Sequence, residues 1–313
     1  MTIDRRDFLM TTVAAGLALE RGTEAQTSAL FPGFETRRIA TSGATINVLR
    51  GGSGPPLLLL HGYPQTHVEW HKIADRLAQR FTLVLPDLRG YGDSSKPPDG
   101  ENHVNYSKRA MALDQVEVMR ALGFDRFAIV GHDRGARVAW RTAVEHPDHV
   151  TRLAVIDIVP TPYSMVTREF ATAYFHWFFL IQAAPLPETL IGNNAEFWLR
   201  TRFLGGSAFT PEALADYLRC FRDPASVHAT CEDYRAGAGI DLQHADDDRG
   251  KKIACPMLVL WGARGTVGRL YDVMNIWRDY ASDLRGTSLP GGHFLPEELP
   301  DDTLAQLLPF LEG

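Results

Sequence analysis

The segment FAIVGHDRGARVAW, from Phe127 to Trp140, carries the clearest structural signal in this chain. Its apolar run Phe127–Val130 predicts a buried strand, and the residues from Arg137 onward predict a helix. The turn between them reads Gly-x-Asp-x-Gly, in which the glycines allow close backbone approach and hold Asp133 in an exposed, strained position. We interpret this as a nucleophile elbow whose nucleophile is a carboxylate. The alternative is a solvated turn carboxylate.

The same alternation of strand and helix continues on both sides of the turn. Further buried strands are predicted at Pro56–Leu60, Phe81–Leu85, Leu153–Ile158, Met257–Trp261 and Thr287–Leu289. Helices are predicted at Val68–Gln79, Tyr106–Leu122, Arg137–Glu145 and Asp302–Leu311. Strands that alternate with helices predict an α/β fold with a mostly parallel central sheet flanked by helices.

Between Val159 and about Gly250 this alternation stops. The stretch is rich in aromatic residues and helix-like, with proline and glycine breaks. It predicts a helical cap that is inserted over the carboxyl edge of the sheet. We therefore expect a core made of residues 28–159 and 251–313, with the cap at residues 160–250.

The first 27 residues differ from the rest. Arg5 and Arg6 precede an apolar, uncharged run, Phe8–Leu19, of 12 residues, whereas a membrane span needs roughly 20. Paired arginines, a short apolar core and a small-residue exit near Ala25 predict a twin-arginine export signal. The mature protein would then be periplasmic or secreted. An ordinary N-terminal helix of a cytoplasmic protein is the alternative.

Composition excludes several classes of function. The 313 residues include 32 basic and 38 acidic side chains, a net charge of −6, which argues against nucleic-acid binding. No other apolar stretch is long enough to span a membrane, so we expect no stable membrane insertion. Cys220, Cys231 and Cys255 lack metal-ligand spacing, and we expect no metal and no cofactor. In an oxidising compartment Cys220 and Cys231 could pair; free buried thiols are the alternative.

With an aspartate in the elbow, the chain resembles the α/β-hydrolase enzymes that use a carboxylate nucleophile. Within them it is similar to the haloacetate (fluoroacetate) dehalogenases, from about Phe31 to the C-terminus. Their aspartate attacks a saturated carbon and forms an alkyl-enzyme ester. Haloalkane dehalogenases and most epoxide hydrolases carry tryptophan directly after the nucleophile, whereas this chain has Arg134.

The resemblance implies the rest of the catalytic machinery. His293, in Gly-Gly-His-Phe before the last helix, would be the general base, and Asp157 would orient it. An Asp inside the apolar run Leu153–Ile158 is costly unless it is paired, which supports this role. The backbone N–H groups of Tyr63, in His-Gly-Tyr-Pro, and of Arg134 would form an oxyanion hole.

The resemblance also implies a substrate site. Arg134 and Arg137, at i and i+3 on the helix after the nucleophile, would clamp the substrate carboxylate. Without the resemblance, the aromatic cluster of the cap would be interpreted as packing. With it, His176, Trp177 and Tyr234 would bind the departing halide.

These expectations predict hydrolysis of a small 2-haloacid to glycolate and halide. The main alternative is an epoxide hydrolase with the same nucleophile and base, in which Tyr174, Tyr217 and Tyr234 could supply donors to the epoxide oxygen. A non-catalytic binding protein on the same scaffold is a further alternative. The partner is a small molecule in each case, and a homodimer is only a family expectation.

Overall fold

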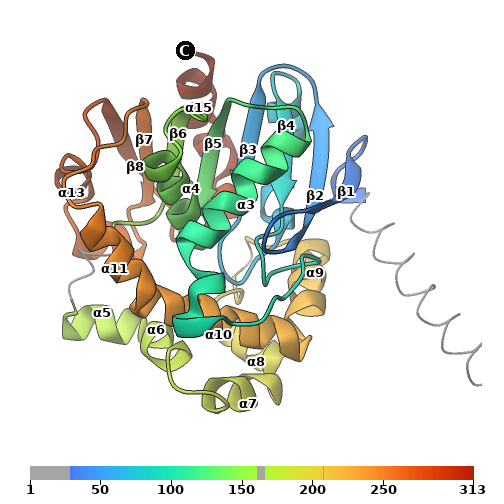
Figure 1. Ribbon diagram of the computed structural model, residues 1–313, viewed down its shortest axis with the longest axis vertical. Coiled ribbons are helices and arrows are strands. Elements are labelled where there is room, and N and C mark those ends of the chain that lie inside the picture. The colour runs from blue at the N-terminus through green and yellow to red at the C-terminus, as the bar shows by residue number, and fades with distance from the viewer. Residues whose placement is uncertain (1–28, 161–165, 207) are drawn as a thin grey trace, which may run out of the picture.

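The computed structural model describes residues 29–160, 166–206 and 208–313, and Figure 1 shows their arrangement. Within these residues an eight-stranded sheet has the order β1-β2-β4-β3-β5-β6-β7-β8. Its strands are β1 (Glu35–Ala40), β2 (Thr45–Gly52), β3 (Pro56–Leu60), β4 (Thr82–Pro86), β5 (Phe127–His132), β6 (Val150–Ile156), β7 (Met257–Gly262) and β8 (Leu284–Leu289).

The strands from β3 to β8 pair in parallel, and β1 and β2 add an antiparallel edge. The four leucines of β3 are fully buried, as expected for a strand covered on both faces. Neither β1 nor β2 was among the predicted strands; β2 has a buried centre, whereas only Ile39 of β1 is buried. An edge strand open to solvent lacks the apolar run that marks the central strands.

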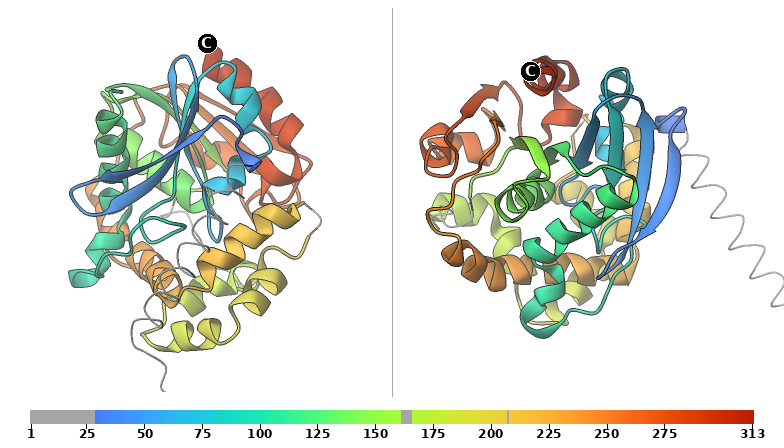
Figure 2. Two further views of the ribbon diagram at one scale, coloured as in Figure 1. Left: turned by 90° about the vertical axis from the view of Figure 1, so that its right-hand side faces the viewer. Right: turned by 45° about the horizontal axis from the view of Figure 1, so that its top comes forward.

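Helices cover both faces of the sheet. Helices α3 (Lys108–Ala121) and α4 (Asp133–Glu145) lie side by side on one face, and α15 (Pro300–Glu312) lies on the other (Figures 1 and 2). The shorter helices of the core are η1 (His67–Trp70), α2 (Ala74–Ala78), η2 (Glu101–Tyr106), α12 (Thr266–Leu270), α13 (Val273–Trp277) and α14 (Leu295–Glu298).

The predicted helix Val68–Gln79 is wrong as a single element. The chain there forms the 3₁₀ turn η1, capped by the Thr66 side chain, and after a break the short helix α2. The break lets His67–Trp70, all buried, turn their side chains into the protein interior. Two short elements therefore replace one amphipathic helix.

A layer of helices lies between β6 and β7 in the chain and covers one end of the sheet, at the bottom of Figure 1. It consists of α5 (Arg168–Ala173), α6 (Phe175–Leu180), α7 (Leu186–Gly192), α8 (Ala195–Arg202), α9 (Pro211–Phe221), α10 (Pro224–Ala238) and α11 (Ile240–Asp247). Together with the sheet, this layer gives the α/β fold with a helical insertion that the sequence predicted.

Three further expectations concern the export signal, membrane insertion and the cysteines. The predicted export signal, residues 1–27, lies outside the described residues. Among the described helices, none combines the length and the apolar character needed to cross a membrane. Cys220, Cys231 and Cys255 are free thiols, and the first two are buried.

Candidate active site

Asp133 lies at the junction of β5 and α4 and has a φ of +44°. This left-handed conformation is strained for a residue with a side chain. Glycines make the turn possible, because a Cβ at Gly135 would lie 2.3 Å from the carbonyl oxygen of Leu60, and one at Gly131 would lie 2.5 Å from that of Gly135. The strand, the turn and the helix therefore hold the Asp133 side chain at the carboxyl end of β5.

The two oxygens of the Asp133 carboxylate have different surroundings. The backbone N–H of Tyr63 donates to Oδ2 at 3.1 Å. The other oxygen, Oδ1, lies 3.9 Å from Nε2 of His293, which is beyond hydrogen-bond range. One oxygen is thus held by a backbone donor, and the other faces the imidazole across a gap.

His293 is oriented by Asp157. Its Nδ1 lies 2.5 Å from Oδ2 of Asp157, whose Oδ1 accepts a hydrogen bond from the Gly262 N–H at 2.9 Å. Asp157 has a φ of +54°, so β6 ends at Ile156, and the predicted strand end at Ile158 is wrong. The left-handed turn at Asp157 places its carboxylate within hydrogen-bond reach of Nδ1 of the imidazole.

A buried ion pair that the sequence analysis missed lies behind the nucleophile. Nδ1 of His132 is 2.8 Å from Glu69, and Nε2 is 2.9 Å from the carbonyl oxygen of His293. Burial alone would lower the pKa of His132, but the Glu69 carboxylate outweighs it and raises that pKa to about 9. No local pattern singles out Glu69, which is placed only by the packing of η1 against the elbow.

This charge also acts on the nucleophile. Burial would raise the pKa of Asp133, but the electrostatic interactions with His293, His132 and Arg134 outweigh it, and the pKa is lowered. The surroundings therefore keep Asp133 ionised, as a nucleophile requires.

A cavity of about 200 Å³ opens above Asp133, below the usual range for drug-sized ligands. The side chains that line it include Tyr63, Asp133, Tyr174, His176, Trp177, Arg202, Phe203, Tyr234, Arg264, Arg269, His293 and Phe294. The core supplies the nucleophile and His293, and the cap supplies most of the aromatic wall. The space fits a small substrate.

All three residues predicted to bind halide line this cavity. The ring centroids of His176 and Trp177 lie 5.9 Å and 6.1 Å from that of Tyr234. Burial, with the nearby Arg202 cation, holds the pKa of His176 well below its usual value, so its imidazole is neutral. The cap thus presents an imidazole, an indole and a phenol to the space above Asp133.

The two predicted carboxylate ligands, Arg134 and Arg137, line a neighbouring cavity of about 210 Å³. Trp177 and Tyr234 belong to both cavities and form the wall between them. Arg134 donates through Nε and Nη2 to the Asp233 carboxylate at 2.8 Å and 2.6 Å, so its Nη1 takes no part in this ion pair. The guanidinium carbon of Arg134 lies 4.3 Å from the ring centre of Tyr234. The guanidinium carbon of Arg137 lies 4.9 Å from the ring centre of Trp177.

The cavity above Asp133 has cations of its own, which the sequence analysis did not single out. Arg202 comes from the end of α8, whereas Arg264 and Arg269 follow β7 and are exposed. The spacing of these three arginines in the sequence does not predict a shared site, because only the packing of the cap and the turn after β7 bring them to one cavity. They make the opening of the cavity attractive to anions.

Only two of the three tyrosines named for the epoxide hydrolase alternative line the cavity. Tyr174 and Tyr234 line the cavity with Asp133. Tyr217 is fully buried in α9 and is not among the lining residues. Two tyrosines on the cap side therefore remain available for that alternative.

The comparisons with known proteins agree with this geometry. The family model of the α/β hydrolase fold matches residues 55–300. Fluoroacetate dehalogenase from Burkholderia sp is 47% identical over 289 residues, which cover 90% of this chain and 95% of that protein. The chain belongs to the α/β-hydrolase fold family, in its haloacetate dehalogenase branch.

Other relatives of this α/β hydrolase are similar along nearly the whole chain. Soluble epoxide hydrolase from Corynebacterium sp. (strain C12) is 32% identical over 280 residues, 86% of this chain and 94% of that protein. A crystal structure from Nostoc sp PCC 7120, provisionally assigned to the α/β hydrolases, has a TM-score of 0.87 and 58% identity and covers 89% of this chain and 98% of that one.

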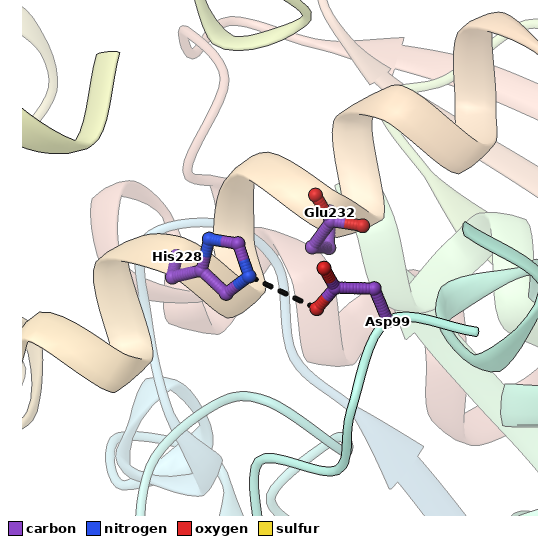
Figure 3. A group of neighbouring side chains, drawn as sticks. All are labelled: Asp99, His228 and Glu232. Atoms are coloured by element: carbon purple, nitrogen blue, oxygen red, sulfur yellow. Dashed lines mark hydrogen bonds and ion pairs between the residues drawn. The ribbon is translucent and has the colours of Figure 1, made fainter. Parts of the chain in front are cut away.

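A second polar cluster, of Asp99, His228 and Glu232, lies between the cap helix α10 and the loop before η2 (Figure 3). Both ring nitrogens of His228 face carboxylates, Asp99 at 2.9 Å and Glu188 at 3.0 Å. The two oxygens of Glu232 face His103 and Arg235. Because side chains of the chain already pair with these groups, we interpret the cluster as a polar network that joins cap and core, and the absence of a metal stays a prediction.

Proposed function

We propose that this α/β hydrolase is a hydrolytic dehalogenase that converts a small 2-haloacid, such as fluoroacetate or chloroacetate, to glycolate and halide. One observation carries the proposal: an ionised Asp133 at a strained elbow lines a cavity of about 200 Å³ together with His176, Trp177 and Tyr234 of the cap. The 47% identity to a fluoroacetate dehalogenase supports it.

The first step is displacement at the α-carbon. An oxygen of Asp133 forms a bond to this carbon, the carbon–halogen bond breaks, and the halide leaves with the bonding electron pair. Donors of the cap residues His176, Trp177 and Tyr234 solvate the halide. Arg134 and Arg137 are proposed to hold the substrate carboxylate, because both adjoin the wall that Trp177 and Tyr234 form beside Asp133.

The second step hydrolyses the aspartyl ester. His293 takes a proton from water, which attacks Cγ of Asp133, and Asp157 stabilises the imidazolium. The 3.9 Å between His293 and Oδ1 of Asp133 gives the imidazole access to this side of the carboxyl group. The N–H groups of Tyr63 and Arg134 form the oxyanion hole, and the Tyr63 N–H already donates to Oδ2. Collapse of the tetrahedral intermediate releases glycolate, which takes the proton from His293. Asp133 is left as the carboxylic acid and returns to the carboxylate by losing the second proton of the water to solvent.

The direct test is halide release from fluoroacetate, chloroacetate and bromoacetate, with Asp133→Asn as the control. Halide and glycolate that wild type forms and the variant does not would support the proposal. Ligand binding without product, unchanged in the variant, would instead favour a non-catalytic binding protein.

An epoxide hydrolase is the second candidate, favoured by Tyr174 and Tyr234 in the cavity and by the Corynebacterium relative. In that reaction the tyrosine hydroxyls donate to the epoxide oxygen, and the same Asp133 and His293 act on the carbon and the ester. An epoxide panel in the same experiment separates the two, because diol without halide release would replace the first proposal with this one.

We also propose that residues 1–27 direct export through a twin-arginine pathway to the periplasm or the medium. The paired Arg5 and Arg6 before a short apolar run support this proposal. Sequencing the N-terminus of protein from a native-type host tests it: a start near Gln26 would support cleavage, and an intact Met1 would contradict it. A homodimer is proposed on family grounds, and light scattering of the purified protein would test it.

A further inference from the structure

His176 and Arg202 meet at the wall of the cavity above Asp133. His176 is the second residue of α6, and Arg202 is the last residue of α8. Nη2 of Arg202 lies 3.0 Å from Nδ1 of His176. A guanidinium offers N–H donors and no acceptor, so Nδ1 must accept this hydrogen bond. In a neutral imidazole the single ring hydrogen is then on Nε2.

The guanidinium of Arg202 is fixed by more than this bond. It also donates to the carbonyl oxygen of Ala173, the last residue of α5. Its central carbon lies 5.2 Å and 4.9 Å from the ring centres of Phe175 and Phe203. Contacts with a carbonyl group and two aromatic rings hold the donor in one orientation toward His176.

We propose that Arg202 is a positioning residue for the leaving group: it holds His176 in the Nε2–H tautomer, which directs a hydrogen-bond donor at the departing halide. This inference rests on the proposed function, because it takes His176 as a halide ligand. Nδ1 is occupied by Arg202, so Nε2 is the ring nitrogen left for a ligand in the cavity that His176 lines. The opposite tautomer would present a lone pair to the halide and repel it.

The burial of His176 makes this arrangement effective. Its imidazole is buried, and burial together with the Arg202 cation lowers its pKa, so it stays neutral and keeps its hydrogen. The hydrogen stays on Nε2 throughout: the halide leaves with the electron pair of the carbon–halogen bond, and His176 only donates a hydrogen bond. Fluoride is the strongest hydrogen-bond acceptor among the halides, so fluoroacetate depends most on this donor.

The tautomer can be measured in the resting enzyme. Imidazole ¹⁵N spectra of the full chain distinguish a protonated ring nitrogen from an unprotonated one, and the signals of His176 are assigned by their loss in His176→Asn. In wild type we expect Nε2 to be protonated and Nδ1 not. In Arg202→Met, which removes the donor, we expect the hydrogen to redistribute toward Nδ1. An unchanged Nε2–H pattern in this variant would overturn the inference.

Kinetics give a second readout that a purely structural role would not move. Loss of one fixed donor typically lowers kcat by about 10²-fold, so we expect Arg202→Met to lower kcat/KM for fluoroacetate by about this factor and for bromoacetate by less than about 10-fold. A similar loss for both substrates would overturn the inference. Wild type that releases no halide would overturn the proposed function, whereas the ¹⁵N experiment would still decide the tautomer.

The chain offers a matched control. Arg200, two residues earlier on α8, is exposed and pairs with Glu196 at 2.7 Å, so Arg200→Met should leave the ratio of fluoroacetate to bromoacetate activity unchanged. Arg202→Lys keeps a cationic donor and should retain most of that ratio. If Arg202→Met fails to fold, Arg202→Lys still tests the inference. The inference would be contradicted if the ratio of fluoroacetate to bromoacetate activity fell about 10²-fold in Arg202→Lys while Nε2 of His176 stayed protonated.

Discussion

Removing the base should separate the two chemical steps of the proposed reaction. His293 makes no hydrogen bond to the nucleophile, since its Nε2 lies 3.9 Å from Oδ1 of Asp133. We therefore predict that His293→Asn still alkylates Asp133 and fails to hydrolyse the ester. Removal of the His293 imidazole raises the pKa of Asp133, but His132 and Arg134 remain beside it, so the carboxylate stays ionised at neutral pH.

The expected size of the effect follows from the role of each group. Loss of a general base lowers turnover by about 10²- to 10⁴-fold, whereas the alkylation step should change only a few-fold. Mixing His293→Asn with excess chloroacetate should release one chloride per active site and then almost stop. Intact-protein mass spectrometry should show a gain of about 58 Da for the carboxymethyl ester, and peptide mapping should place it on Asp133.

Two results would refute this reasoning. Steady turnover of His293→Asn near the wild-type rate would exclude His293 as the base, and the absence of both burst and adduct would exclude a separate alkylation step. Asp133→Asn is the control and should show neither burst nor adduct. Wild type that turns over in ¹⁸O-labelled water should also gain about 2 Da on Asp133, because water attacks its carboxyl carbon.

Three further predictions test the residues around Asp133 and His293. Asp157→Asn should lower kcat by about 10³- to 10⁴-fold in steady-state halide release, because the imidazolium loses the carboxylate that stabilises it; a loss below 10-fold would argue against the role. Arg137→Met should lower kcat/KM for chloroacetate by about 10- to 100-fold through the lost charge-assisted bond, and an unchanged value would place the carboxylate elsewhere, for example at Arg264 or Arg269. The pKa of His132 is raised to about 9, so the stability from its ion pair with Glu69 should be complete below the unfolded pKa of about 6.5 and lost as pH rises through 9. Melting temperatures between pH 6 and 10 should show this decline in wild type and a flatter curve in Glu69→Gln, and parallel curves would contradict it.

Local sequence patterns predicted much of the fold because the central strands are short apolar runs that end at characteristic turns. Phe127–Val130 followed by Gly-x-Asp-x-Gly predicted both a strand and the side chain presented at its end. The strand Pro56–Leu60 has the predicted bounds. The exposed edge strand β1 lacks such a run, so its place in the sheet could not be predicted from periodicity.

The parts of the site that could not be predicted from the sequence depend on contacts between residues far apart in the chain. Glu69 is 63 residues before its partner His132, and Arg202 is 26 residues after His176. Neither pair belongs to a motif, and only the packing of η1 on the elbow and of α8 on α6 brings them together. The wall of Trp177 and Tyr234 between two cavities likewise depends on how the cap packs, which spacing does not reveal.

In the proposed reaction the fold itself supplies the direction of displacement. Attack at a saturated carbon requires the nucleophile and the leaving group on opposite sides of that carbon. Asp133 reaches the cavity from the end of β5, whereas the proposed halide donors His176, Trp177 and Tyr234 come from α6 and α10 of the cap. The line of displacement therefore runs from core to cap. It follows that substitutions in the cap should change the choice of leaving group and leave the position of nucleophile and base intact, whereas substitutions at the elbow should abolish the reaction for every halide.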